Sequence, residues 1–204
     1  MTSEQLHVIF YIMHNILITG CSSGLGLALA DKFESTGHKV MRHNGRAHYD
    51  LRSGEDIKKM CQEAKSKNIN VLINNAAITC PDILFDKYSE SLIDDMINVN
   101  LKAPILLSRL LFNDLTNIIN INSMVGLEVK SPRTMYSATK WGLRGFSNSL
   151  KKENSNIKIL DVYPTNIKTA PDRENAMELD FVVESIYQSF LKEEQQLLLD
   201  GRKL

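Results

Sequence analysis

Short apolar runs alternate with longer amphipathic stretches along the chain. The apolar runs have the length of strands, and the amphipathic stretches carry apolar residues at helical spacing. This alternation is typical of a three-layer α/β fold, a doubly wound parallel sheet with helices on both faces. The predicted strands are residues 15–19, 39–42, 48–51, 70–73, 118–122, 157–162 and 197–199, about seven in all, and the predicted helices are 24–35, 54–66, 91–111, 134–153 and 179–191.

The second and third predicted strands lie unusually close together in the sequence. Only residues 43–47 separate them, whereas parallel neighbours need a connection of about a dozen residues, usually a helix. Either the crossover helix has been lost or the third strand is vestigial. We therefore predict a shortened sheet edge, and a full helix between Arg42 and His48 would refute this prediction.

The length of the chain fits one domain. A chain of 204 residues can bury enough apolar surface to fold without disulfides or metals, so we predict a single catalytic domain over residues 13–204. Residues 1–12 precede the first strand, either as an appended extra strand or as the product of an upstream start. Their apolar run is too short to span a bilayer, and they lack the flanks of a signal peptide.

Charge and cysteine content argue against several classes of partner. Lys and Arg number 24, as do Asp and Glu, so electrostatics gives no reason to expect nucleic acid or a membrane as partner. Cys21, Cys61 and Cys80 form neither a CxxC pair nor a metal-ligand pattern. We expect three reduced thiols, no metal site and a cytoplasmic protein.

A glycine-rich turn, TGCSSGLG at residues 19–26, joins the first predicted strand to the first helix. Gly20 permits a tight turn, and Gly24 and Gly26 remove side chains where the backbone approaches a pyrophosphate or packs on the sheet. The helix N-terminus would offer N–H groups to the phosphates. A glycine motif alone is weak evidence, but its place between a strand and a helix favours a dinucleotide site.

Tyr136 and Lys140 lie four residues apart in a predicted helix, so their side chains share one face. A free phenol has a pKa near ~10, and a nearby ammonium lowers it, which gives a general acid/base near neutral pH. Ser123 follows the predicted strand 118–122 at its carboxyl end, where ligand sites gather in such sheets, and its hydroxyl can bond a carbonyl oxygen. Taken alone, Lys140 would more often be a solvated lysine and Ser123 a turn residue. Their occurrence together with Tyr136 argues against coincidence.

Together these motifs resemble the compact branch of the short-chain dehydrogenase/reductase family, with its TGxxxGxG and YxxxK motifs, over nearly all of residues 15–200. The resemblance implies a Rossmann-type fold and NAD(P)-dependent interconversion of a carbonyl and an alcohol on a small-molecule substrate. It also implies a homodimer or homotetramer built on the two long helices. Asn100 matches the helical Asn with which the family holds a proton-relay water. The catalytic residues so implied are Asn100, Ser123, Tyr136 and Lys140.

Three further segments resemble cofactor-binding segments of the family. They are NNAA at residues 74–77, the Asp50-Leu51 pair at the adenine, and PTNIKT at residues 164–169 beside the nicotinamide. Thr165 replaces the usual glycine, and because a β-branched residue is strained at positive φ, we expect the local turn to differ. The cofactor-binding residues so implied are Gly20, Ser22, Ser23, Gly24, Leu25, Gly26, Asn44, Arg46, Asp50, Leu51, Asn75, Ala76, Tyr136, Lys140, Ile167 and Thr169.

The end of the second predicted strand bears on the choice of cofactor. In the family an acidic residue there selects NAD, and basic residues select NADP. Asn44 stands at this position, between Arg42 and Arg46, whereas Ser23 replaces a basic residue that many NADP-dependent members carry. On balance the sequence favours NADP(H) over NAD(H).

One alternative function stays open. Ala77 and Thr165 replace family glycines, and the substrate-lid region 170–178 is short. These departures favour a catalytically weak NAD(P)-binding protein that senses redox state. The complete Asn-Ser-Tyr-Lys set favours the enzyme.

Overall fold

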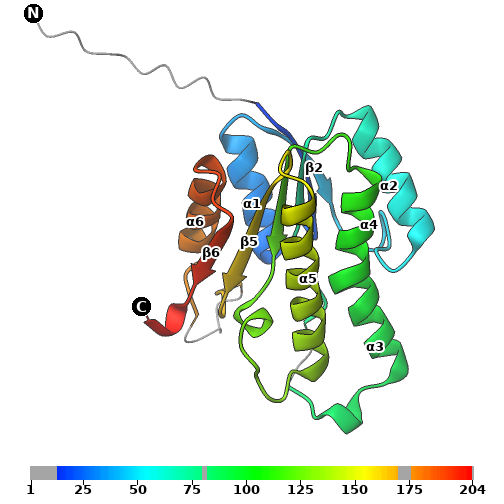
Figure 1. Cartoon of the computed structure of the whole chain (residues 1–204), viewed down its shortest axis with the longest axis vertical. Helices are drawn as coiled ribbons and strands as arrows, with labels where there is room; N and C mark the ends of the chain where they lie inside the picture. The colour runs from blue at the N-terminus through cyan, green and yellow to red at the C-terminus, as the bar shows by residue number, and fades with distance from the viewer. Residues whose placement is uncertain (1–12, 80–81, 170–175, 204) are drawn as a thin grey trace, which may run out of the picture.

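The computed structural model of the protein describes residues 13–79, 82–169 and 176–203. The predictions for residues 1–12 and Cys80, and most of the shortened segment 170–178, lie outside these described residues. The described chain forms three layers, with a parallel sheet between two layers of helices (Figure 1). The three-layer α/β prediction is therefore confirmed.

Within the described residues, the sheet has six parallel strands in the order β2-β1-β3-β4-β5-β6. β2 lies on one side of β1 and β3 on the other, so the strand order reverses at β1. Ligands of such sheets bind in the crevice at this reversal, outside the carboxyl ends of the strands. The strands are β1 (Asn15–Thr19), β2 (Lys39–His43), β3 (Val71–Asn74), β4 (Asn117–Ile121), β5 (Lys158–Pro164) and β6 (Gln196–Leu199).

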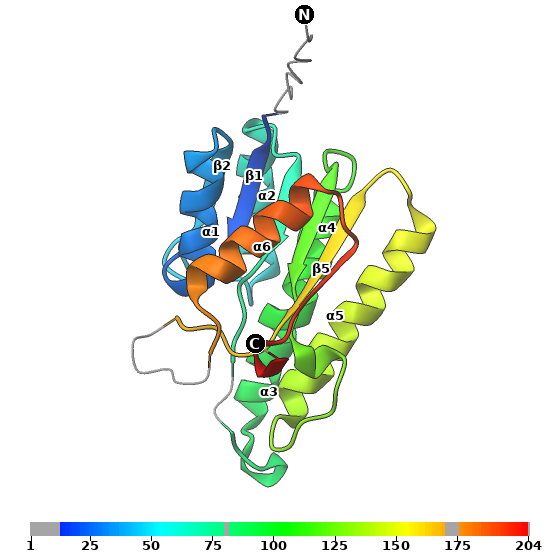
Figure 2. The ribbon, with the colours of Figure 1, turned by 90° about the vertical axis from the view of Figure 1, so that its left-hand side faces the viewer.

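Helices cover both faces of the sheet, as Figures 1 and 2 show. Leu17 and Ile18 are neighbours in β1 and point to opposite faces, each into a separate buried cluster. Because both faces are buried, the strands are apolar throughout rather than alternating. α1 (Gly24–Ser35) and α6 (Leu179–Leu191) cover one face, and α2 (Gly54–Ser66), α3 (Glu90–Ile97), α4 (Ala103–Leu110) and α5 (Thr134–Glu153) lie on the other.

The prediction of a seventh strand at residues 48–51 is wrong. β2 is the edge of the sheet, and residues 44–53 form a loop that leads directly into α2. No helix lies between Arg42 and His48, so the predicted shortened edge is confirmed. The physical reason is the short connection, which is too small for a crossover to a parallel neighbour.

The predicted long helix 91–111 is interrupted. α3 and α4 are joined by a π-helical turn, Asn98–Lys102, which contains Asn100. Apolar periodicity does not reveal such a turn, because the buried residues Met96, Asn100, Ala103 and Leu107 keep a spacing of three or four residues across it. The other four predicted helices have the predicted bounds.

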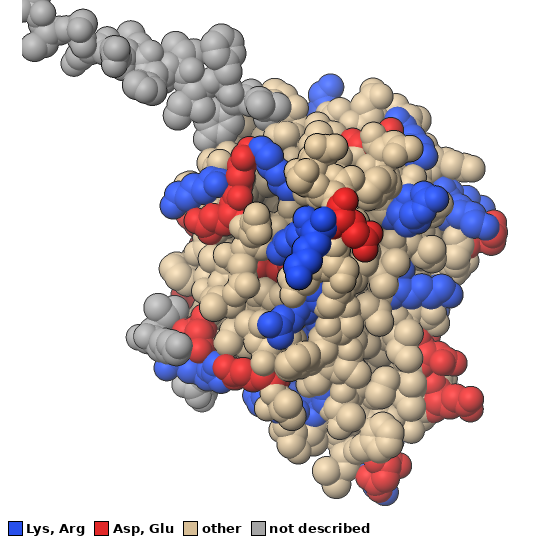
Figure 3. Space-filling model, viewed as in Figure 1, with Lys and Arg blue, Asp and Glu red and all other residues tan. Residues whose placement is uncertain are grey.

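Basic and acidic side chains are interspersed on the face of the molecule shown in Figure 3. This mixture agrees with the balanced charge of the sequence. Within the described part of the chain, no helix has the length and apolar character needed to cross a bilayer.

Candidate active site

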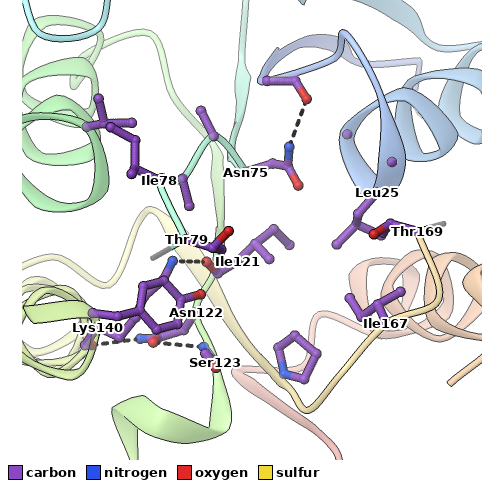
Figure 4. Close-up of a pocket in the computed structure, with 18 of the residues that line it drawn as sticks. Leu25, Asn75, Ile78, Thr79, Ile121, Asn122, Ser123, Lys140, Ile167 and Thr169 are labelled. Atoms are coloured by element: carbon purple, nitrogen blue, oxygen red, sulfur yellow. Dashed lines mark hydrogen bonds between the residues drawn. The ribbon is translucent and has the colours of Figure 1, made fainter. Parts of the chain in front are cut away.

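A cleft of about 1220 Å³ runs along the carboxyl ends of the strands. Asn44 and Asn100 are not among its lining residues, although the family resemblance implies both as site residues. The remaining implied site residues meet here from segments far apart in the sequence, as the close-up in Figure 4 shows for several of them. These lining residues are Gly20, Ser22, Ser23, Gly24, Leu25, Gly26, Arg46, Asp50, Leu51, Asn75, Ala76, Ser123, Tyr136, Lys140, Ile167 and Thr169.

The glycine turn is packed tightly against the end of β3. Gly20 has a φ of +75°, and a Cβ there would lie 2.9 Å from the Cα of Ala76. A Cβ on Gly26 would overlap the carbonyl oxygen of Gly20 and the side-chain amide of Asn75. Both positions therefore require glycine, and the turn keeps its backbone open to the cleft.

Residues after β3 brace this turn through hydrogen bonds. Asn75 Nδ2 donates to the carbonyl oxygen of Thr19 at 2.8 Å and to that of Gly20 at 3.1 Å, the bond dashed in Figure 4. Thr19 Oγ1 accepts the backbone N–H groups of Asn75 and Ala76, each at 3.0 Å. The NNAA segment thus fixes the glycine turn to the sheet.

Lys140 is fully buried beside the phenol of Tyr136. Its side chain is 2% exposed, and Nζ donates to the carbonyl oxygen of Ile121 at 2.8 Å (Figure 4). Burial lowers the pKa of Lys140 to about 8, so the ammonium still predominates at neutral pH. Nζ lies 5.6 Å from the centroid of the Tyr136 ring. A buried cation therefore lies beside the ring of Tyr136.

Asn122 links Ser123 to α5, a role that the sequence did not indicate. Its Oδ1 accepts the N–H of Ser123 at 2.9 Å, and its Nδ2 donates to the carbonyl oxygen of Lys140 at 3.2 Å. A Cβ on Gly126 would lie 2.5 Å from Asn122 Oδ1, so that glycine leaves room for the amide. Asn122 thereby holds the serine and the lysine in one arrangement (Figure 4). A polar residue directly after an apolar strand was the only available signal.

Asn100 is buried behind the cleft rather than lining it. Its Oδ1 accepts the N–H of Ile78 at 2.7 Å, and its Nδ2 donates to the carbonyl oxygen of Ile78 at 2.9 Å and to Thr139 Oγ1 at 3.3 Å. Thr139 Oγ1 in turn donates to the carbonyl oxygen of Tyr136 at 2.8 Å. Asn100 therefore ties the segment after β3 to the helix that carries Tyr136, and its role in holding a water stays a prediction.

Asp50 lies at the end of the cleft lined by the glycine turn and the loop 44–53. Its carboxylate accepts from Arg52 Nε at 2.9 Å and from Nη2 at 2.5 Å. This hydrogen bonding to Arg52 lowers the pKa of Asp50 to about 2. Arg52 Nη1 also lies 3.1 Å from Asp95 of α3, so the loop is tied to the helix layer.

The two arginines near the end of β2 differ in their placement. Arg42 faces α1, where it pairs with Asp31 at 2.6 Å and with Glu34 through two bonds of 2.6 and 2.9 Å. Arg46 lines the cleft, with its side chain 65% exposed and 3.9 Å from Asp95. Arg46 is therefore the arginine of this pair that can meet a ligand in the cleft.

Thr165 adopts an ordinary backbone conformation. In the described part of the chain, the only non-glycine residues with positive φ are Asn68 and Glu193. The Thr165 N–H donates to the Leu199 carbonyl oxygen at 2.9 Å, and its hydroxyl accepts the N–H of Gly201 at 2.9 Å. The residue that replaces the family glycine thus docks the C-terminal turn against the cleft. Because Thr165 and Gly201 are far apart in the sequence, no local pattern indicates this contact.

Ion pairs surround the opposite end of the cleft. Arg133 pairs with Asp82 at 2.6 Å. Arg202, in the C-terminal turn, pairs with Glu128 through bonds of 2.9 and 3.1 Å. Lys130 also lines this end. Both ion pairs are at least partly exposed to solvent.

Comparison with known sequences gives a consistent result. A sequence profile described as short chain dehydrogenase matches residues 45–179. The chain is 31% identical over 197 residues to nodulation protein G of a Rhizobium strain, with 83% of this chain and 80% of that protein covered. It is 32% identical over 194 residues to a 3-oxoacyl-acyl-carrier-protein reductase of Rickettsia prowazekii, with the same coverage.

Solved structures share the same fold. A bulky-bulky ketone specific alcohol dehydrogenase from Comamonas testosteroni matches with a TM-score of 0.81 and 23% identity, over 91% of this chain and 86% of that one. A short-chain dehydrogenase from Sphingobium yanoikuyae in complex with NADPH matches with a TM-score of 0.78 and 22% identity, over 91% and 87% of the chains.

Proposed function

Because the chain belongs to the short-chain dehydrogenase/reductase family, we propose that it interconverts a carbonyl and an alcohol group with Tyr136 as general acid and base. Members of this family are oxidoreductases that act on CH–OH and C=O groups with NAD(P)(H). The observation that carries the proposal is the buried Lys140 ammonium, 5.6 Å from the Tyr136 ring in a cleft whose other end is a glycine turn. A bound nicotinamide dinucleotide would supply or accept the hydride.

In this proposal, the residues of the cleft transfer the proton, lower the pKa of the phenol and bind the substrate oxygen. Tyr136 gives a proton to the carbonyl oxygen in reduction and takes it back in oxidation. Lys140 lowers the pKa of the phenol through its charge, and the Ser123 hydroxyl donates to the substrate oxygen. Asn122 keeps Ser123 and Lys140 at a fixed separation through the two bonds of its amide.

The glycine turn fits a dinucleotide pyrophosphate. Gly20 and Gly26 let the turn pack closely against the end of β3, and the N-terminus of α1 faces the cleft through Gly24 and Leu25. Helix N-termini bind phosphate through free N–H groups and the positive end of the dipole. Ile167 and Thr169, from the segment after β5, line the same cleft, with Thr169 beside Gly24 of the turn, and would contact the nicotinamide.

NADP(H) is the proposed cofactor, with Arg46 as the partner of the 2′-phosphate. Arg46 lines the end of the cleft formed by the glycine turn and the loop 44–53, the proposed adenosine end, whereas Arg42 is held by two carboxylates of α1. A structure of similar fold, from Sphingobium yanoikuyae, is a complex with NADPH. Replacing Arg46 by Ala should weaken NADPH about tenfold and leave NADH unchanged, since only NADPH carries the phosphate that arginine binds. Equal loss for both cofactors would overturn this assignment.

Titration with NADPH and with NADH, followed by Trp141 fluorescence, tests the cofactor. Trp141 adjoins Lys140 in α5, so a bound reduced nicotinamide should quench it. Reduction of a panel of polar carbonyl compounds then tests the chemistry. Tyr136→Phe should lose about 100-fold or more in rate because the acid is gone, while it still quenches. Full activity in this variant would overturn the role of Tyr136.

No observation in the described part of the chain favours the alternative of a non-catalytic redox sensor. Thr165 has an ordinary backbone and docks the C-terminal turn, so its replacement of glycine is no sign of a lost site. Tight dinucleotide binding without turnover on any carbonyl would nevertheless support the sensor.

Assembly, domain extent and location complete the proposal. Members of the family are commonly oligomeric. We expect a homodimer or homotetramer through the helix layer of α3, α4 and α5, where Ile97 and Trp141 are 39% and 43% exposed. Light scattering of the purified protein would give the mass of the assembly. One catalytic domain over residues 13–204 and a cytoplasmic location stay predictions.

A further inference from the structure

His43 ends β2 at the edge of the sheet and contacts the glycine turn twice. Its ring Nδ1 lies 3.2 Å from the N–H of Gly20, and its carbonyl oxygen accepts the N–H of Cys21 at 2.8 Å. The residue is 2% exposed. Two successive N–H groups of the turn are therefore bound by one residue of the neighbouring strand.

The other ring nitrogen of His43 contacts the loop that replaces the missing strand. Nε2 lies 2.8 Å from the carbonyl oxygen of Tyr49. Because Nδ1 accepts from Gly20, Nε2 must carry the proton and donate to Tyr49. Several residues of this loop line the adenosine end of the cleft, namely Gly45, Arg46, Tyr49, Asp50 and Leu51.

We propose that His43 is a positioning residue for the dinucleotide, which holds the glycine turn and the loop 44–53 in their binding arrangement through its neutral Nε2–H ring. The inference rests on the proposed function and adds to it. Protonation of Nδ1 would bring two N–H donors face to face at Gly20. That contact would be lost, and the turn would have to move away from β2.

The surroundings of His43 favour the neutral ring at neutral pH. Burial lowers its pKa most, and the positive charge of a protonated His48 in the loop acts in the same direction. The carbonyl oxygens of Tyr49 and Gly45 and the charge of Asp50 oppose these effects. From the turn, Cys21 faces His43 as a neutral thiol, since burial raises its pKa to about 11. Arg42, the preceding residue, pairs with Asp31 and Glu34 of α1.

This arrangement predicts a pH-dependent affinity for the dinucleotide. The affinity should be constant above the ordinary imidazole pKa of ~6.5 and should fall below it as Nδ1 takes up a proton. Loss of one hydrogen bond in the turn corresponds to a fall of about fivefold. His48 lies in the same loop with an exposed ring, so it offers a matched control.

The dissociation constant of the reduced dinucleotide is to be measured by Trp141 fluorescence between about pH 5.5 and pH 7.5. In His43→Asn, an amide oxygen near the place of Nδ1 accepts from Gly20 without titrating, so its affinity should not change with pH beyond the titration of the ligand itself. His43→Leu should bind weakly throughout. His48→Gln should keep the pH-dependent fall and move it only slightly, to higher pH, because the charge of His48 opposes protonation of His43. Since the 2′-phosphate of NADPH titrates equally in every titration, the difference between parent and His43→Asn isolates the ring.

The outcomes separate this inference from the proposed function. If parent and His43→Asn lose affinity in parallel at low pH, the positioning role is overturned while the dinucleotide site stands. If the parent binds no dinucleotide at about pH 7.5, the proposed function fails first. A ¹⁵N spectrum of the parent imidazoles gives a measurement that needs no variant. We expect the Nε2–H form for His43, and an Nδ1–H form would contradict the proposal.

Discussion

The floor and the mouth of the cleft use polar groups in opposite ways. At the floor, Lys140 and Asn122 are almost fully buried and bond to backbone groups of β4 and α5. At the mouth, Arg202 pairs with Glu128, and both side chains are at least half exposed. The floor side chains are thus held in place by buried hydrogen bonds, whereas the mouth side chains are exposed to solvent.

This difference follows from the cost of burial. A buried polar group that loses its partner costs far more than the net gain of an ordinary hydrogen bond, whereas exposed ion pairs contribute little to stability. The floor is therefore restricted to side chains that satisfy one another. Charged residues at the mouth can be substituted with little loss of stability. The mouth is therefore the part of the cleft that can adapt to a substrate.

A second buried group of polar residues lies within the sheet beneath the floor. Asn120 Oδ1 accepts from Asn74 Nδ2 at 2.8 Å, and Asn120 Nδ2 lies 3.3 Å from Asp161 Oδ1. The Asp161 carboxylate is 1% exposed and pairs with Lys151 at 2.6 Å. β3, β4 and β5 are thus linked by side chains as well as by their backbones.

The largest effect is expected from Lys140→Met, which keeps the length of the side chain and removes its charge. Without the ammonium the phenol of Tyr136 returns toward its ordinary pKa, so carbonyl reduction should fall by about 100-fold or more. Steady-state rates at saturating dinucleotide measure this. Lys152→Met, an exposed lysine of the same helix, should keep the parent rate, and an unchanged rate in Lys140→Met would remove Lys140 from the mechanism.

Lys151→Met should give the largest loss of stability. It leaves the buried Asp161 carboxylate without its cation, and breaking such a pair costs about 3 kcal/mol. Urea unfolding measures the free energy of unfolding. Lys152→Met again serves as the control, with an expected change below about 0.5 kcal/mol. Equal effects in the two variants would mean that the Lys151 pair is no stronger than a surface contact.

The rate of carbonyl reduction should fall as the pH rises through about 8, the value to which burial lowers the pKa of Lys140. Above it the ammonium is neutralised, and the rate should drop about tenfold per pH unit. Unfolding does not explain this loss. Between about pH 8 and the ordinary lysine pKa of ~10.4, Lys140 is protonated more in the unfolded than in the folded protein. In this range Lys140 therefore makes the free energy of unfolding rise with pH. A flat profile would show that the cation is not needed.

The smallest effect on the fold is expected from Arg202→Ala at the mouth. The Arg202 side chain pairs with Glu128 and with Asp200 and is 56% exposed, so the midpoint of thermal unfolding should stay within about 2 °C of the parent. KM for a polar carbonyl substrate should change severalfold, while KM for the dinucleotide stays the same. Arg109→Ala, an exposed residue of α4, is the control. A large loss of stability would show that this exposed pair contributes to stability as the buried groups of the floor do.

The sequence by itself determined the elements that depend on local spacing. Apolar periodicity located six of the strands and the bounds of four helices, since burial of a face imposes its period on the chain. The four-residue spacing of Tyr136 and Lys140 implied that they share one helix face, and the glycine turn was evident from its position between a strand and a helix. These are relations between residues that are close along the chain.

Only the tertiary structure decided the relations between distant residues. Residues 48–51 resemble a strand, but a strand needs a partner, and the connection is too short to supply one. The ring of His43 lies between the glycine turn and Tyr49, Asn122 lies between Ser123 and Lys140, and Thr165 holds Gly201. These contacts depend on which strands are neighbours and how the loops meet above the sheet, and no periodicity within one segment carries that information.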